Sequence, residues 1–450
     1  MDRRSARPAS RGAHAAGPAG RPRRGPHVAD LTAFLAGLGA TEPSSGPGDG
    51  DPRVGARLWG DLGCFSCHGL KADDEGAWIG LAGAAQKFRP GALAAFLQEP
   101  GRHDPWIRMP DLKLSADEAL HLEAFLREQG GESRNSADLG DAERGARRFV
   151  ELGCARCHDA GVELGAAATP LDALLVSGDW GRGCMAADAD ARGKAPAFRF
   201  DADERQALTA FAAASGGSLS RDAVADFATR QLEERRCTSC HVLDGRTATW
   251  VEREPDLAPL RPAPRPVHGE EHVEVAQLRP ALTLVGEKLR LEWLRGFLAG
   301  EIASPRPWLH ARMPRLAPVV ASGLAAGLAA QHGLGADEEP IDVAADRVAV
   351  GRSLIAQEGG FGCVTCHAVG AQQPKALFEV QGINLAEVGA RLRSDWYRAW
   401  MLDPPRFEAA AKMPKYADEA GRTALPPFDG DARAQFDAIW HFIHGAEELR

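Results

Sequence analysis

Small and large apolar residues recur at a fixed spacing in four short stretches of the chain. In each stretch a Gly or Ala is followed four residues later by a large apolar residue. The pairs are Gly55 and Trp59, Gly145 and Phe149, Ala228 and Leu232, and Gly351 and Ile355. Residues four apart share one face of a helix, and a small residue lets a second helix approach closely. Accidental small residues in an Ala-rich chain would not share this offset, so the pattern predicts four helices, each crossed by another.

A second apolar pattern follows three of these stretches. Trp, Leu and Phe recur at helical spacing, a Pro-containing loop comes next, and the stretch ends on a basic residue, Met and Pro. The three stretches are Leu93–Pro110, Trp293–Pro314 and Trp396–Pro414. Proline fixes φ and removes a backbone donor, which helps to hold a loop in one shape. Each stretch therefore predicts a helix and then a restrained loop that carries a methionine.

A further helical stretch completes each repeat. These stretches are Ser115–Glu128, Asp201–Ala214, Val320–Gln331 and Asp431–His444. Ser115 and Glu118 have the spacing of a capping box, and Asp201 and Asp431 are suited to cap the helices that they precede. Large apolar residues on these helices, such as Phe211 in the second repeat, are expected to face the first helix of the same repeat.

The composition agrees with a helical chain. It is rich in Ala and Leu and has only two tyrosines, and few runs of β-branched residues occur, which favours helices over sheets. A chain of 450 residues can hold about three or four compact domains. We therefore predict an all-α protein of four tandem domains, called here modules one to four. They span residues 48–131, 136–216, 220–335 and 341–450, after a basic, irregular segment at 1–47.

Each first helix leads into the same five-residue motif, Cys-x-x-Cys-His. The motif cysteines are Cys64 and Cys67, Cys154 and Cys157, Cys237 and Cys240, and Cys363 and Cys366; the histidines are His68, His158, His241 and His367. This spacing is the attachment signature of c-type haem, with two thioether bonds and the adjacent imidazole at the iron. A zinc ribbon needs no histidine at that offset, and a thioredoxin-like dithiol normally occurs once, beside a βαβ pattern. The motifs predict four covalent haems c.

The methionines before Pro complete the expected iron sites of three modules. Met109, Met313 and Met413 are three of only six methionines in the chain. A thioether is a soft ligand for iron and raises the haem potential relative to harder ligands, whereas the alternative role of a methionine is to fill gaps in a core.

The order of helix, Cys-x-x-Cys-His, Met loop and terminal helix resembles class I cytochrome c domains. In tandem, over about residues 50–450, it is similar to PVC-type multidomain bacterial cytochromes c. The resemblance implies a helical bundle around each haem, with the motif His and the distal Met as axial ligands.

Module two departs from this pattern. Its single methionine is Met185, which lies beside Cys184 in a glycine-rich turn, only 27 positions after His158. Three alternatives follow for the second haem: ligation by Met185, approach of Cys184 or of a residue from a neighbouring module, or a vacant or water-bound position. Cys184 by itself is expected to be a small buried residue in a tight turn.

Residues 1–27 contain seven arginines and one aspartate, and the apolar run that follows, Val28–Ala40, is short and interrupted by Asp30. A signal peptide is therefore weakly indicated, although haem attachment implies a periplasmic or otherwise extracytoplasmic protein. The segment His27–Gly39 is expected to be the last helix of a preceding domain. Without the first 27 residues the chain has 46 basic and 61 acidic residues, which argues against nucleic acid as a partner. No stretch is long enough for a membrane span.

These expectations point to electron transfer. Haems with both axial positions filled move electrons without binding substrate, so redox proteins are the expected donors and acceptors. Short connectors favour packing of module one with two and of three with four. The alternative is a haem enzyme, a peroxidase or small-oxyanion reductase, with the second haem as its open site.

Overall fold

The computed structural model describes residues 26–38, 50–70, 79–130, 140–160, 170–214, 223–260, 277–375 and 381–449. Within these ranges, residues 82, 89–90, 103–106, 157, 159, 179, 194, 199, 259 and 338–339 lie outside the description. The predicted all-α class is confirmed, because the described chain is mostly helical. None of the described helices is long and apolar enough to cross a membrane.

Nineteen α-helices form the described part of the chain. They are α1 (Pro26–Leu38), α2 (Pro52–Asp61), α3 (Ala84–Lys87), α4 (Ala92–Gln98), α5 (Ala116–Gln129), α6 (Ala142–Glu151), α7 (Leu171–Ser177), α8 (Ala189–Arg192), α9 (Ala202–Ala213), α10 (Val224–Glu234), α11 (Thr249–Arg253), α12 (Val285–Lys288), α13 (Leu291–Leu298), α14 (Pro318–Ala330), α15 (Ala345–Ile355), α16 (Leu385–Arg391), α17 (Ser394–Leu402), α18 (Pro404–Phe407) and α19 (Ala432–Gly445). The described strands, β1 (His68–Gly69) and β2 (Ile79–Gly80), form a short parallel pair.

The predicted helix caps are confirmed. The Ser115 side chain accepts the Glu118 N–H, and the Glu118 side chain accepts the Ser115 N–H, which completes a capping box at the start of α5. Asp201 forms the same kind of box at α9, and Asp431 caps α19. Each cap satisfies a backbone donor that the helix leaves unpaired.

The close helix crossings predicted from the small residues are also confirmed. The packed pairs are α2 with α5, α6 with α1, α10 with α14, and α15 with α19. A methyl group added at Gly55, Gly145 or Gly351 would lie only 2.0 to 2.2 Å from a backbone carbonyl of the crossing helix. In the α10–α14 pair the glycine lies on the second helix, where Gly327 meets Ala228. Backbones that approach this closely tolerate no side chain at the crossing point.

The helix that crosses α6 in module two is not the expected one. Asp201–Ala214 forms α9, but α1 packs against α6, with Phe34 beside Phe149 at a ring-centroid distance of 5.5 Å. Asp30 of α1 is buried and accepts the N–H of Asp141 and the guanidinium of Arg144. The expectation that Phe211 faces α6 was therefore wrong. Phe34 and Phe211 both end the sequence Leu-Thr-Ala-Phe. In α1 this sequence follows Asp30, whose carboxylate accepts the Asp141 N–H before α6, whereas in α9 it follows Ala207.

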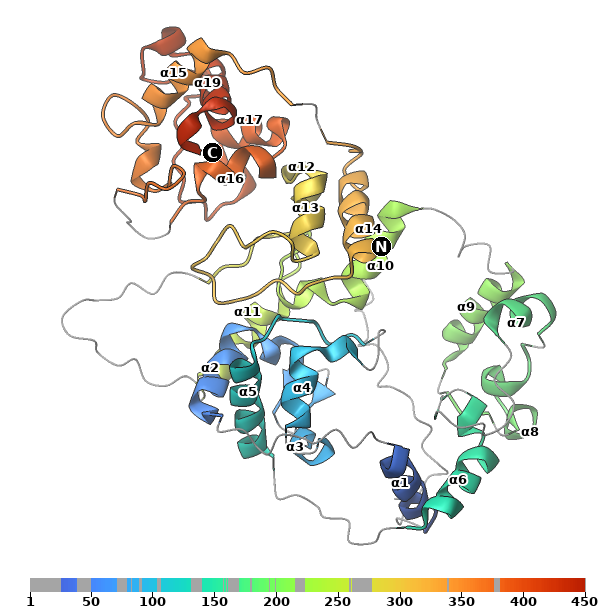
Figure 1. The fold of residues 1–450 in the computed structure, drawn as a ribbon. Helices are drawn as coiled ribbons and strands as arrows, with labels where there is room; N and C mark the ends of the chain where they lie inside the picture. Colours follow the sequence, from blue (N-terminus) through green and yellow to red (C-terminus); the bar gives the residue numbers. More distant parts are fainter. Residues whose placement is uncertain are drawn as a thin grey trace. The chain divides into compact units, whose positions relative to one another are not determined.

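The contacts divide the chain into two compact units (Figure 1). One unit contains α1 and α6 to α9, and the other contains α2 to α5 and α10 to α19. In the second unit, modules three and four share one apolar core that reaches from Ala228 to Ala446. Their expected packing is confirmed by an antiparallel bridge between Leu289 and Leu392.

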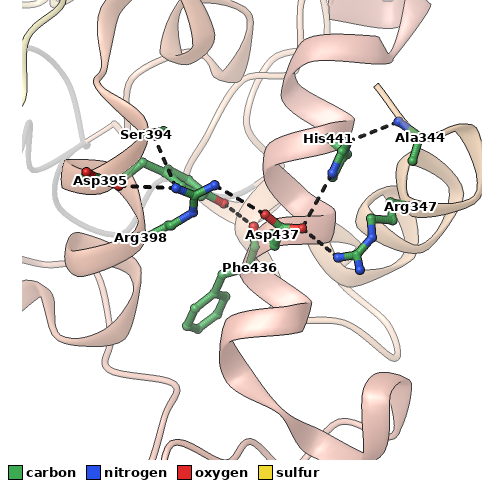
Figure 2. Close-up of polar contacts among 9 residues, drawn as sticks. Ala344, Arg347, Ser394, Asp395, Arg398, Phe436, Asp437 and His441 are labelled. Atoms are coloured by element: carbon green, nitrogen blue, oxygen red, sulfur yellow. Dashed lines mark hydrogen bonds and ion pairs between the residues drawn. The ribbon is translucent and has the colours of Figure 1, made fainter. Parts of the chain in front are cut away.

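A charged network joins three helices of module four (Figure 2). Asp437 of α19 accepts from Arg347 of α15 at 2.6 Å and lies 3.7 Å from a guanidinium nitrogen of Arg398 of α17. His441, one turn later, lies 3.6 Å from Asp437 and accepts the N–H of Ala344 before α15. The network holds the α15–α19 crossing at its polar edge, while the apolar face of α19 remains turned to the core.

Candidate haem-binding sites

The backbone turns sharply just before each motif. The residue that precedes the first cysteine has a left-handed φ in all four modules: 79° at Gly63, 74° at Gly153, 55° at Arg236 and 74° at Gly362. A 3₁₀ turn then begins at each first cysteine, as η1 (Cys64–Ser66), η3 (Cys154–Arg156), η6 (Cys237–Ser239) and η8 (Cys363–Thr365). Glycine adopts this φ without a steric cost, and three of the four modules have glycine at this position. Arg236 adopts the same φ in module three, so the motif cysteines begin from the same backbone turn in all four.

In module one the structure brings the three predicted ligand types to one cavity. Cys64, His68 and Met109 line one partly open hollow together with apolar side chains. The apolar lining residues are Trp59, Leu81, Ala84, Phe88, Leu93, Phe96, Leu97, Leu122 and Leu126. Cofactor sites are concave and mostly apolar, and here the side chains that could bind a cofactor come from the motif and the Met loop.

The histidines of modules three and four are held by backbone carbonyls. The Nδ1 of His241 lies 2.7 Å from the carbonyl oxygen of Pro280, and the Nδ1 of His367 lies 2.7 Å from that of Ile383. A carbonyl can only accept, so Nδ1 carries the proton and Nε2 keeps its lone pair. Burial also lowers the pKa of both imidazoles. Each ring is therefore neutral and oriented as an axial iron ligand would be.

The two methionines of these modules lie at the same core as their motifs. Met313 and Met413 pack, half-buried, against the shared core, as do Cys237 and Cys363. The indole N–H of Trp400 donates to the sulfur of Met413 at 3.1 Å. This contact orients the thioether from one side, and its remaining lone pair stays available to a metal.

The motif thiols are in a low-polarity environment. Burial raises the pKa of Cys64 and of Cys363 to about 12, and that of Cys237 to about 11. In the described ranges, no group of three or more His, Cys, Asp or Glu side chains could hold a metal ion.

Buried cations form a part of the site that the sequence analysis did not identify. Lys288 lies over the rings of Trp396 and Trp400, at 5.5 and 5.4 Å, and Arg391 lies over Trp293 at 5.2 Å. The two positions are equivalent in modules three and four, since Lys/Arg-Leu-Arg-x-x-Trp stands at 288–293 and again at 391–396. This repeat was the signal that could have revealed them.

Burial shifts the pKa of these two cations and of Arg279 in module three. Burial and neighbouring cations lower the pKa of Lys288 to about 7, and burial foremost lowers that of Arg391 to about 9 and that of Arg279 to about 10. The Nε of Arg391, the Nη2 of Arg279 and the indole nitrogen of Trp396 are buried and have no hydrogen-bond partner within the described ranges. Unpaired buried charge is costly, so an anionic group beside these two guanidinium groups would stabilise them.

Module two differs from the other modules in structure as well as in sequence. His158 is exposed, whereas the motif histidines of the other modules are half-buried. Met185 is half-buried and its carbonyl accepts from Arg205. The expectation that Cys184 is buried was wrong, because the tight turn at Gly183 presents its thiol to solvent. Cys157 lies outside the described residues.

The other histidines also gain definite positions. His121 accepts the N–H of Asp51 at the start of α2, in the manner of His441 at α15. Both are half-buried helix caps. His103, His268 and His272 lie outside the described residues.

The residues present fit a haem in two respects. The cavity of module one holds thiol, imidazole and thioether together, and the buried Arg279 Nη2 and Arg391 Nε, which have no hydrogen-bond partner among the described residues, suit carboxylates such as the haem propionates. Comparisons with protein families, with characterised proteins and with solved structures found no match to the chain.

Proposed function

We propose that the chain is a multihaem c-type cytochrome that carries electrons between redox protein partners. The observation that carries the proposal is the cavity of module one, which Cys64, His68 and Met109 line together although Met109 stands 41 positions after His68. A bound haem would supply one-electron chemistry at its iron. The chain would supply burial, orientation and charge, which set the potential.

Each class of residue has a defined part in this proposal. The paired cysteines would bind the haem edge, and the carbonyls of Pro280 and Ile383 would hold His241 and His367 at the iron. Met109, Met313 and Met413 would occupy the opposite side and exclude other ligands. Lys288 and Arg391 would neutralise propionates, which favours a high potential because a nearby positive charge stabilises bound electrons.

Haem quantification tests the proposal directly. Denatured protein from a host that exports it and attaches haem should contain four covalently bound haems per chain, one for each motif. Variants with both motif cysteines changed to Ala, Cys363→Ala with Cys366→Ala for example, should contain one fewer. A count of two or three in the unaltered chain, or a count unaffected by the substitutions, contradicts the proposal.

The exposure of His158 supports a second candidate, a haem enzyme with the second haem as its open site. An exposed proximal histidine and a shortened loop to Met185 leave the environment of that iron different from the other three. Addition of carbon monoxide to the reduced protein and of cyanide to the oxidised protein tests whether the second haem has an open position at its iron. Absence of ready binding to any of the four haems would exclude an open site.

A further inference from the structure

The first and third haem-attachment motifs lie directly against each other. The sulfur of Cys67 is 3.4 Å from the hydroxyl of Ser239, and the hydroxyl of Ser66 is 4.0 Å from the sulfur of Cys240. The contact is reciprocal, because in each motif the serine meets the second cysteine of the other. Connector lengths had favoured a pairing of module one with module two, and they did not predict this one.

A tryptophan and an arginine from α11 of module three pack against the first motif. The ring of Trp250 packs on Phe65 at a centroid distance of 4.8 Å, and a methyl group added at Gly63 would lie 2.5 Å from it. Arg253 donates to the carbonyl oxygens of Phe65 and His68, at 2.6 and 3.3 Å. Trp250 and Arg253 are both buried, so this part of module three belongs to the core of module one.

The methionine loops of the same two modules are also joined. The N–H of Arg315 donates to the carbonyl of Asp111 at 2.9 Å, and the guanidinium of Arg315 lies 2.6 Å from the Asp111 carboxylate. Arg312, the residue before Met313, is paired with Glu118 of α5. Contacts at the cysteine side and at the methionine side fix the relative orientation of the two sites within this unit.

We propose that the chain holds the first and third haems as a directly coupled pair, in contact at the edges that Cys67 and Cys240 would bind. This proposal rests on the proposed function and adds a specific partner for the first haem. Each thioether sulfur would be bonded to its own haem, so haem edges must lie where these two thiols lie. One electron would pass from ferrous to ferric iron, with no proton or atom transferred. Trp250 and Arg253 are positioning residues for the pair.

Circular dichroism of the Soret band measures the coupling, because two haems in close contact share their electronic transitions and produce a paired positive and negative signal. The samples are the full-length haem-loaded protein, a variant without the first haem (Cys64→Ala, Cys67→Ala), one without the third (Cys237→Ala, Cys240→Ala), and one without both. The pairwise signal is obtained as in a double-mutant cycle: the spectra of the two single-haem-loss variants are subtracted from the sum of the parent spectrum and the spectrum of the variant without both haems. We expect a clear non-additive, two-signed signal.

A second pair of variants tests the coupling without removing a haem, so the test does not depend on the folding of the cysteine variants. Trp250→Ala removes the buried ring that packs on Phe65 of the first motif, and Val251→Ala changes the exposed neighbour on the same helix. With four haems bound in both variants, Trp250→Ala should lose most of the pairwise signal and Val251→Ala should keep it. Four haems without a pairwise signal in the parent protein overturn the coupled pair alone. Fewer than four haems in the parent overturn the proposed function itself.

Discussion

At the scale of single residues, the space beside the proximal histidines is closely defined. A methyl group added at Gly382 would lie 2.5 Å from Nδ1 and Cε1 of His367. The Gly382→Ala protein should therefore lose about 1–3 kcal/mol of unfolding free energy, the usual cost of overpacking. Denaturant unfolding measures the loss. The matched control is Gly335→Ala, since nothing lies within 4 Å of that position. Equal stability of the two variants would contradict the close fit around His367.

The proposed methionine ligands can be tested in the same way. Met313→Ala should remove one far-red methionine–iron(III) absorption band and lower the potential of one haem, because a soft ligand no longer stabilises the ferrous state. Spectra recorded during redox titration show both effects. Met401→Ala is the control, because Met401 is a buried core residue of α17. If the spectrum of Met313→Ala matches that of the parent, the ligand is another residue.

At the scale of helices, the α1–α6 crossing should carry much of the stability of its unit. Phe34 is buried at the crossing and contacts Phe149, whereas Phe211 on α9 is only half-buried. We expect Phe34→Ala to cost about 3–5 kcal/mol, as for other buried aromatic residues. Phe211→Ala should cost clearly less. Amide hydrogen exchange of residues 142–151 reports the crossing, and a larger effect of Phe211→Ala would restore α9 as the partner of α6.

The interface between α12 and α17 predicts a pH dependence. The pKa of Lys288 is lowered from 10.5 to about 7, mainly by burial and also by Arg391 and Arg306, with Glu408 opposing. Between about pH 7 and 10.5 the folded chain would then bind fewer protons than the unfolded chain, so stability would rise with pH. A propionate beside Lys288 would restore its pKa and remove that rise.

Denaturant unfolding of the haem-loaded protein at pH 7 and pH 10 tests this assignment. With a propionate in place, the parent and Lys288→Met should show the same change of stability between the two pH values. A steeper rise in the parent than in Lys288→Met would mean that Lys288 has no counter-charge, and the propionate would have to lie elsewhere.

At the scale of the whole molecule, the haems should be part of the folded cores. In module one the proposed site is an apolar hollow lined by buried core residues such as Trp59, Leu93 and Leu122, and an unfilled hollow in a core loses packing contacts. Protein made in the cytoplasm without export should contain no covalent haem and should be poorly folded. Broad, poorly dispersed proton NMR signals would show this. A cooperative thermal transition equal to that of the haem-loaded protein would contradict it.

The sequence by itself determined the local features of this protein. The four small-to-large pairs predicted the helix crossings, and the Ser115 and Glu118 spacing predicted a capping box, because neighbours one helical turn apart interact whatever the rest of the chain does. The meeting of His68 with Met109 in one cavity also followed from the order of the motifs within one module.

Only the tertiary structure decided which segments are partners. Phe34 and Phe211 stand in the same four-residue sequence, and the choice of α1 for α6 depends on the buried Asp30, which pairs with residues more than 100 positions away. The contact of Ser66 and Cys67 with Cys240 and Ser239 likewise joins residues more than 170 positions apart. Local patterns define helices and turns, but long-range pairing depends on complementary packing and charge between whole surfaces, which local spacing does not record.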